Sequence, residues 1–218
     1  MEQKLIIFDC DGVLVDSEPL AAEAYVRIFA KHGLGITTEV INQCIGMKQS
    51  DIFQRIEDLT GHAFPIEHQD DIWPETRALF NEALTPVPGI VAFLERLQLP
   101  RCVASSSSIE RITFSLARTG LLPFFGESIF SSSMVKNGKP APDLFLFAAR
   151  QMEVAPSKSV VIEDSPFGVQ GAVAAGMFVI GFTGGGHTTA KHSEELVRSG
   201  AHKIFSHWDD IGEFLLSN

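Results

Sequence analysis

Short apolar runs mark the chain, one near its start and the others after residue 100. The first run, residues 5–8, contains no polar residue, which is typical of a strand buried on both faces. Further runs of this kind predict strands at 102–104, 128–130, 160–162, 178–182 and, with a weaker pattern, 203–205.

Between most of the later runs, the apolar positions change to helical spacing. Residues 109–116 and 143–152 have this pattern, with the apolar side chains of the second segment on one face. Strands that alternate with helices predict a parallel sheet covered by helices on both faces. We therefore expect an α/β fold with a doubly wound, Rossmann-like core.

The first connection differs, because residues 17–86 contain no run that predicts a buried strand. Amphipathic helical patterns fill this segment instead, at 18–32, 38–44, 50–60 and 67–84. A stretch rich in proline and glycine, 86–89, follows the last of them. We expect a helical cap domain, residues 17–86, inserted into a core domain made of residues 1–16 and 87–218.

Two carboxylates, Asp9 and Asp11, follow the first strand, and Gly12 allows the chain to turn there. In an open parallel sheet, ligands bind at the carboxyl ends of the strands. Paired carboxylates at such a place cost free energy through mutual repulsion and partial burial. A bound cation, or a chemical role for one of the two, would account for the pair.

Polar residues follow the later strands as well. They are Ser105 and Ser106, then Lys139, and finally the acidic pair Glu163 and Asp164. Carboxylate oxygens are the ligands that suit Mg²⁺. A serine, a lysine and the N-terminus of a helix suit a phosphate. Together the strand ends predict a site for Mg²⁺ and a phosphate group.

The net charge of −10, from 17 basic and 27 acidic side chains, disfavours nonspecific binding to nucleic acid or an anionic membrane. No apolar run approaches the roughly 20 residues of a membrane-spanning helix, and the start has no signal-peptide pattern. Three cysteines without metal-ligand spacing fit a reducing compartment. We expect a cytoplasmic monomer or weak dimer whose partner is a small phosphorylated metabolite.

The polar residues at the strand ends resemble, in order, the four signature motifs of the haloacid dehalogenase superfamily of aspartyl-phosphate enzymes. Residues 9–17 are similar to the first motif, and Ser105 closes a match to the second. Lys139 matches the third motif, and Glu163 with Asp164 matches the fourth. The resemblance is greatest to members with a helical cap after the first strand, which include sugar-phosphate phosphatases and β-phosphoglucomutase.

The resemblance implies a catalytic role for several of these residues. Asp9 would be the nucleophile that forms an aspartyl phosphate. Asp11 would be the general acid that protonates the leaving alcohol, and then the base that activates water. Ser105 and Lys139 would hold the transferring phosphoryl group, with Ser106 beside them.

The resemblance also implies a Mg²⁺ site. Asp9, the backbone carbonyl of Asp11, and Asp164 would bind the ion, and Glu163 would reach it through water. Asp11 must hold a proton in the first step, so its side chain is expected to point away from the metal. These roles imply a Mg²⁺-dependent phosphatase that acts on a small phosphorylated sugar or sugar acid.

A phosphosugar mutase is the main alternative. The β-phosphoglucomutases carry a cap arginine that grips the second phosphate of a bisphosphate. In this chain Gln49 stands where we expect that arginine, and the adjacent Lys48 lacks the bidentate fork of a guanidinium. We expect Gly46, Lys48 and Gln49 to be the cap residues that meet the substrate.

Two further classes remain, and the residues disfavour both. Dehalogenating members of the superfamily generally lack a carboxylate two residues after the nucleophile, where this chain has Asp11. A haloacid also has no alcohol leaving group that needs a proton. A protein that binds a phosphorylated metabolite without turnover would not need the complete set of catalytic residue types that is present.

A glycine loop, residues 184–186, follows the strand at 178–182. Its spacing is not that of a dinucleotide-binding or phosphate-binding loop, so we expect no cofactor there. His187 follows the loop, and we expect it to take no part in the site. The other histidines, His192 among them, stand in segments that look like surface.

Overall fold

A computed structural model describes residues 5–189 and 191–216, so positions 1–4, 190 and 217–218 of the predicted core lie outside the described residues. Within the described ranges, six strands form one parallel sheet in the order β3-β2-β1-β4-β5-β6. The strands are β1 (Leu5–Phe8), β2 (Arg101–Ser105), β3 (Ile129–Ser131), β4 (Ser159–Glu163), β5 (Phe178–Phe182) and β6 (Lys203–Phe205). This is the strand order of a doubly wound, Rossmann-like sheet, and it confirms the predicted fold class.

The register of β1 determines which residues meet at the edge of the sheet. Phe8 lies opposite Val103 of β2 and Ile162 of β4. Asp9 therefore emerges beside the last residues of both neighbours, Ser105 and Glu163. Because the three strands are parallel, their polar ends lie at one edge of the sheet.

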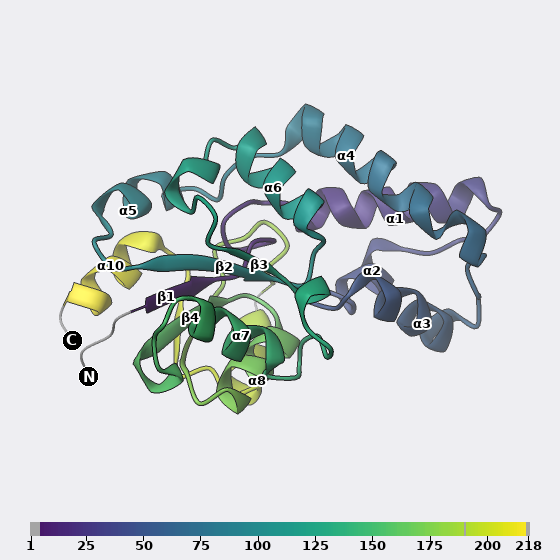
Figure 1. Ribbon diagram of the computed structural model, residues 1–218. Helices are drawn as coiled ribbons and strands as arrows, with labels where there is room; N and C mark the ends of the chain where they lie inside the picture. The colour runs from purple at the N-terminus through teal and green to yellow at the C-terminus, as the bar shows by residue number, and fades with distance from the viewer. Residues whose placement is uncertain (1–4, 190, 217–218) are drawn as a thin grey trace.

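Helices cover both faces of the sheet (Figure 1). One face packs against α5 (Ile90–Arg96), α6 (Ile109–Arg118) and α10 (Trp208–Leu216), and the other against α7 (Asp143–Gln151), α8 (Pro166–Ala174) and α9 (His192–Arg198). Ile6 and Phe8 of β1 belong to the first cluster, and Leu5 and Ile7 to the second. Alternate residues of a strand face opposite sides, so a strand covered on both sides is apolar throughout.

Residues 17–86 contribute helices and pack around an apolar cluster of their own. The helices are α1 (Glu18–Lys31), α2 (Thr38–Asn42), α3 (Gln49–Thr60), the 3₁₀ helix η1 (Ile66–Asp71) and α4 (Ile72–Ala83). The rings of Phe29 and Phe64 stack at the centre of the cluster with centroids 4.4 Å apart. In Figure 1 this segment extends from one end of the sheet. Its division from the core as a cap domain stays a prediction.

The predicted single helix at 67–84 is wrong, because the segment divides into η1 and α4. Pro74 has no backbone N–H group, so it would interrupt the interior of an α-helix that began at residue 67. In the first turn of α4 the backbone N–H groups have no partner within the helix, so a proline is tolerated there. The helical pattern predicted at 50–60 corresponds to α3 (Gln49–Thr60). Helix α3 begins one residue earlier, at Gln49, with Lys48 at the N-cap.

The two connections at the ends of residues 17–86 run side by side. Asp16 N donates to Thr85 O at 3.0 Å, and Val87 N donates to Leu14 O at 3.0 Å. Helix α4 of this segment packs on α6, one of the helices that cover the sheet, and the rings of Trp73 and Phe114 meet there edge to face. In the part of the chain that the structure describes, no helix has the length and apolar character needed to cross a bilayer.

Candidate active site

The site begins where β1 ends, with a buried pairing of Asp9 and Lys139. The ammonium of Lys139 lies 2.7 Å from Asp9 Oδ1 and also contacts Glu163 Oε1. Lys139 comes from the loop before α7, and its side chain is fully buried. Although burial alone lowers it, Asp9 and Glu163 raise the pKa of Lys139, so this lysine is a fixed cation.

Glu163, the last residue of β4, is held from both of its oxygens. Its Oε2 accepts hydrogen bonds from Ser165 N at 2.9 Å and from Ser165 Oγ at 3.0 Å. A Cβ on Gly168 would lie 1.8 Å from Glu163 Oε1, so only glycine fits there. The start of α8 therefore fixes the carboxylate toward Lys139.

Asp9, Glu163 and Asp164 form a buried acidic cluster whose ligand atoms all lie within 4.8 Å of one another. Burial raises the pKa of Asp9 to about 7 despite the opposing effect of Lys139. Burial, together with Glu163 and Asp9, raises the pKa of Asp164 as well. Asp164 Oδ2 is buried and has no hydrogen-bond partner among the described residues.

This cluster fits a divalent cation with oxygen ligands. Its three carboxylates face a single ammonium, and an added positive charge would favour their ionised forms. Asp164 Oδ2 is a buried acceptor without a hydrogen-bond partner among the described residues, and the lone pairs of a carboxylate leave room for both a hydrogen bond and a cation. An all-oxygen donor set suits Mg²⁺ rather than Zn²⁺.

Asp11 lies outside this cluster, and its carboxylate is turned elsewhere. Its Oδ1 accepts from Ser17 Oγ at 2.6 Å and from Arg111 Nη2 at 2.7 Å, and its Oδ2 accepts from Ser107 Oγ at 2.6 Å. Burial alone would raise its pKa, but Arg111 and the hydroxyls of Ser107 and Ser17 lower the pKa of Asp11. The side chain is therefore ionised and oriented by three donors.

Arg111 is a residue of the site that the sequence reasoning missed. It lies in the first turn of α6, and its guanidinium also sits over the ring of Phe80, 5.2 Å from the centroid. A signal was available, because a cation in the first turn opposes the helix dipole. The ion pair with Asp11 compensates this unfavourable position.

The serines after β2 connect the sheet edge to residues 17–86. Ser105 is buried, and its Oγ accepts from Ser107 N at 3.1 Å. Ser106 Oγ donates to Gly46 O at 2.7 Å, between the loop after β2 and the loop before α3. Gly46 has a φ of 83°, and a Cβ on it would lie 2.3 Å from Ser165 Oγ. Only glycine permits this approach.

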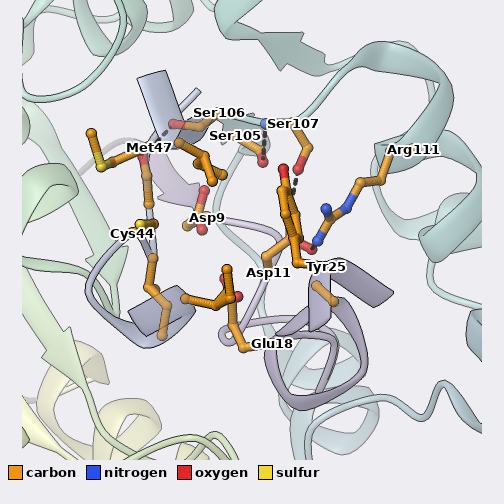
Figure 2. A pocket seen from close by; sticks show the side chains of 15 residues that line it. Asp9, Asp11, Glu18, Tyr25, Cys44, Met47, Ser105, Ser106, Ser107 and Arg111 are labelled. Atoms are coloured by element: carbon orange, nitrogen blue, oxygen red, sulfur yellow. Dashed lines mark hydrogen bonds and ion pairs between the residues drawn. The ribbon is translucent and has the colours of Figure 1, made fainter. Parts of the chain in front are cut away.

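These residues surround a cavity between the sheet edge and residues 17–86 (Figure 2). Asp9, Asp11, Ser105, Ser106, Ser107 and Arg111 line its polar side. Tyr25, Cys44 and Met47 line it from the other segment, and Glu18 completes the wall. Burial raises the pKa of Glu18 to about 8. The cavity therefore has polar side chains at the sheet edge and a mixed polar and apolar wall contributed by residues 17–86.

Of the three expected cap residues, Gly46 lines this cavity, while Lys48 and Gln49 are directed elsewhere. A Cβ on Gly138 would lie 2.6 Å from Lys48 Cε, so the lysine stem lies across the loop that precedes Lys139. Gln49 Nε2 donates to Gln69 O at 3.1 Å. Gln49 instead borders a neighbouring cavity that it shares with Arg111.

The expectation that His192 stands at the surface is wrong, and the side chain of His187 is also buried. His187 is buried with its Nε2 3.2 Å from Asp164 Oδ2, and His192 is buried with its Nε2 2.6 Å from Asp164 O. Burial lowers the pKa of His187 to about 4, so its ring is neutral near pH 7. The glycine loop and the start of α9, which follow β5, thus place both rings against Asp164. This contact joins segments far apart in the sequence, and no local pattern predicts it.

Known proteins resemble the chain over most of its length. It matches the haloacid dehalogenase-like hydrolase family over residues 3–176. It is 30% identical to a 6-phosphogluconate phosphatase of Escherichia coli K12 over 184 residues, which cover 84% of this chain and 83% of that protein.

Solved structures agree with this similarity. A haloacid dehalogenase-like protein of unknown function from Agrobacterium tumefaciens superposes with a TM-score of 0.84 at 36% identity, covering 99% of this chain and 98% of that one. A putative β-phosphoglucomutase from Bacteroides vulgatus superposes with a TM-score of 0.80 at 29% identity, covering 99% and 90%.

Proposed function

The chain belongs to the haloacid dehalogenase-like hydrolase family, and from this membership we propose that it is a Mg²⁺-dependent phosphatase of a small phosphorylated sugar or sugar acid. The observation that carries the proposal is the contrast between two neighbouring carboxylates. Asp9 lies in the acidic cluster beside Lys139, whereas Asp11 is turned out of the cluster. One carboxylate is thus available to a metal and to phosphorus, and the other to a proton.

In this proposal Asp9, Asp164 and the backbone carbonyl of Asp11 would hold the ion, and Glu163 would reach it through water. When bound, Mg²⁺ supplies positive charge that keeps the carboxylates ionised and offsets the charge of the phosphate. The buried carboxylates of this cluster outnumber the ammonium of Lys139, which supports a site for a cation.

The first step is attack by an Asp9 oxygen on phosphorus. The bond from phosphorus to the leaving oxygen breaks, and Asp11 gives that oxygen a proton, so an alcohol departs. Lys139 and Ser105 bind the transferring phosphoryl oxygens and offset their charge. Asp11 must be protonated at this stage, and an anionic phosphate beside it raises its pKa.

The second step returns Asp9 to its starting state. Ionised Asp11 takes a proton from a water molecule as the water attacks the phosphorus of the aspartyl phosphate, and the bond to Asp9 breaks. Inorganic phosphate is released. The lowered pKa of Asp11 in the free protein supports its role as the base of this step.

We further propose that residues 17–86 act as a cap that closes over the substrate. The hydrogen bond from Ser106 Oγ to Gly46 O joins the two sides of the cavity, and opening of the cap would break it. Closure would exclude bulk water from the acyl phosphate until the alcohol has left. The cap wall would select the substrate, and the free cysteines support a cytoplasmic location.

A phosphosugar mutase is the second candidate, favoured by the similarity to the structure titled as a putative β-phosphoglucomutase. A mutase must bind a second phosphate, which calls for a cation on the cap side of the cavity. Among the described residues that line the cavity, the basic side chain is Arg111, which belongs to α6 and not to residues 17–86. Gln49 donates to Gln69 O and does not line the cavity. This arrangement favours the phosphatase.

The two candidates separate in one assay. The protein with Mg²⁺ is offered a panel of phosphorylated sugars and sugar acids, together with β-glucose 1-phosphate and a trace of its bisphosphate. Steady release of inorganic phosphate that stops on chelation supports the phosphatase and identifies the substrate class. Conversion to glucose 6-phosphate with little release supports the mutase.

A further inference from the structure

A buried histidine, His187, faces the carboxylate of Asp164. Its Nε2 lies 3.2 Å from Asp164 Oδ2, and the two side chains are 2% and 1% exposed. Among the described residues neither atom has a hydrogen-bond partner, because the geometry between them falls short of a hydrogen bond. Two buried polar atoms at this distance need only a small rotation to pair, and leaving both unpaired costs free energy.

A second histidine holds the backbone of the same aspartate. His192, the first residue of α9, has its Nε2 2.6 Å from Asp164 O. A carbonyl oxygen can only accept, so His192 Nε2 carries the proton. The rings of His187 and His192 meet edge to face with centroids 5.3 Å apart. The segment after β5 thus contacts both the main chain and the side chain of Asp164.

The glycines explain how this segment comes so close. A Cβ on Gly185 would lie 2.7 Å from Gly12 O. A Cβ on Gly12 would lie 1.8 Å from Asp164 Oδ2 and 2.8 Å from His187 Cε1. Side chains at these positions would push the loops apart. The absence of Cβ atoms is what allows His187, Asp164 and the loop after β1 to pack together.

We propose that His187 is a positioning residue for the metal site, whose Nε2–H donates to Asp164 Oδ2 and so fixes this carboxylate for Mg²⁺. The inference rests on the proposed function, in which Asp164 is a ligand of the ion. Carboxylates that bind metals are themselves commonly hydrogen-bonded, and loss of such a partner weakens metal binding about 10–100-fold. The imidazole itself is not a ligand, because Mg²⁺ takes oxygen.

The test is the Mg²⁺ affinity of the full chain, measured by isothermal titration calorimetry with MgCl₂. His187→Leu removes the donor with little change in volume, and His187→Gln keeps an N–H at similar reach. His62→Leu is the matched control, because His62 is exposed and is far from residue 187 in the sequence. We expect the dissociation constant to rise about 10–100-fold in His187→Leu, and to stay near the wild-type value in His187→Gln and His62→Leu.

Thermal unfolding without Mg²⁺ separates positioning from packing. The inference is overturned if His187→Leu binds Mg²⁺ like the wild type. It is also overturned if the leucine and glutamine variants lose affinity equally and in proportion to their loss of melting temperature. Should the leucine variant fail to fold, His187→Asn, whose amide is too short to reach Asp164, takes its place under the same criteria.

The outcome for the wild type distinguishes this inference from the proposed function. A wild-type protein that binds no Mg²⁺ overturns both. A wild-type protein that binds Mg²⁺ and releases phosphate, beside a His187→Leu variant of equal affinity, overturns only the role of His187.

Discussion

Arg111 Nη2 lies 2.7 Å from Asp11 Oδ1, and this partly buried ion pair joins the first turn of α6 to the loop after β1. The same guanidinium sits over the ring of Phe80 in α4, and Ser17, at the start of α1, donates to the same oxygen. The orientation of Asp11 therefore depends on α6 and on residues 17–86 together. In the proposed mechanism, this is the residue that handles both protons.

Replacement of Arg111 is expected to impair the proton-transfer step. Arg111→Ala leaves Asp11 without its ionic partner, and kcat on a sugar phosphate should fall about 100-fold, in the range that general acid–base catalysis contributes. The loss should be smaller with p-nitrophenyl phosphate, whose leaving group departs without a proton. Steady-state kinetics on both substrates measures the difference, and equal losses on the two would contradict this role.

A double-mutant cycle makes that prediction sharper. Residues that act as a unit are non-additive, so Arg111→Ala should have little further effect in an Asp11→Ala background. Arg111→Lys serves as the control, because lysine keeps the positive charge but lacks the paired N–H donors of a guanidinium. Full additivity of the two losses would show that Arg111 acts independently of Asp11.

Gly12 is expected to be indispensable for a reason beyond its backbone. It has a φ of 73°, and a Cβ on it would lie 1.8 Å from Asp164 Oδ2. Gly33 has a φ of 74° but open space around it, so Gly33→Ala carries the backbone cost alone, about 1–2 kcal/mol. Gly12→Ala should lower stability further and abolish phosphate release. Activity in Gly12→Ala equal to that of Gly33→Ala would refute the packing argument.

Ser106 is expected to stabilise the closed arrangement of the cavity. Ser106→Ala removes the hydrogen bond to Gly46 O, which contributes about 0.5–1.5 kcal/mol, so KM should rise about 2- to 10-fold. Ser108→Ala is the control, because Ser108 caps α6 by accepting from Arg111 N, and its loss should lower the melting temperature instead. A KM that rises equally in both variants would argue against the contact.

Glu18 is expected to make stability depend on pH. Its pKa is about 8 in the folded protein against 4.5 as the ordinary value. Between these pH values the folded chain keeps a proton that the unfolded chain releases, so unfolding becomes more favourable as pH rises toward 8. Glu18→Gln removes this dependence.

The melting temperatures of wild type and Glu18→Gln should therefore coincide near pH 4.5. Above it they should diverge, with the variant at least about 2–4 °C higher at pH 8, the shift expected for about 1 kcal/mol. Glu23→Gln, on the exposed side of α1, should show no such trend. A difference that stays constant from pH 4.5 to pH 8 would mean that Glu18 is ionised in the folded protein.

The sheet could be predicted because its strands are apolar on both faces. The run at residues 5–8 is typical of the centre of a covered sheet. The later strands up to β5 repeat that pattern, and the edge strand β6 has it only weakly. The approach of Asp9, Lys139 and Glu163 follows from parallel topology, since strand ends meet at one edge. Local pattern and topology were sufficient for this part.

The rest depends on contacts that no local pattern contains. His187 reaches Asp164 only because glycines let two loops touch, and Gln49 turns toward Gln69 through a loop geometry without a sequence signature. Arg111 could have been found from its unfavourable place in the first turn of α6. The single helix expected at 67–84 overlooked Pro74, whose missing N–H was visible in the sequence.

The most direct test of the central claim is to trap the covalent intermediate on Asp9. The protein is mixed with Mg²⁺ and the substrate identified by the panel, quenched in acid within one turnover, and reduced with borohydride, which converts an aspartyl phosphate to homoserine. Mass spectrometry of the peptide that contains Asp9 should detect homoserine at this position, only with substrate and Mg²⁺, and never in Asp9→Asn, which should fold normally and release no phosphate. Steady phosphate release with an unmodified Asp9, or substantial activity in Asp9→Asn, would contradict the aspartyl-phosphate mechanism.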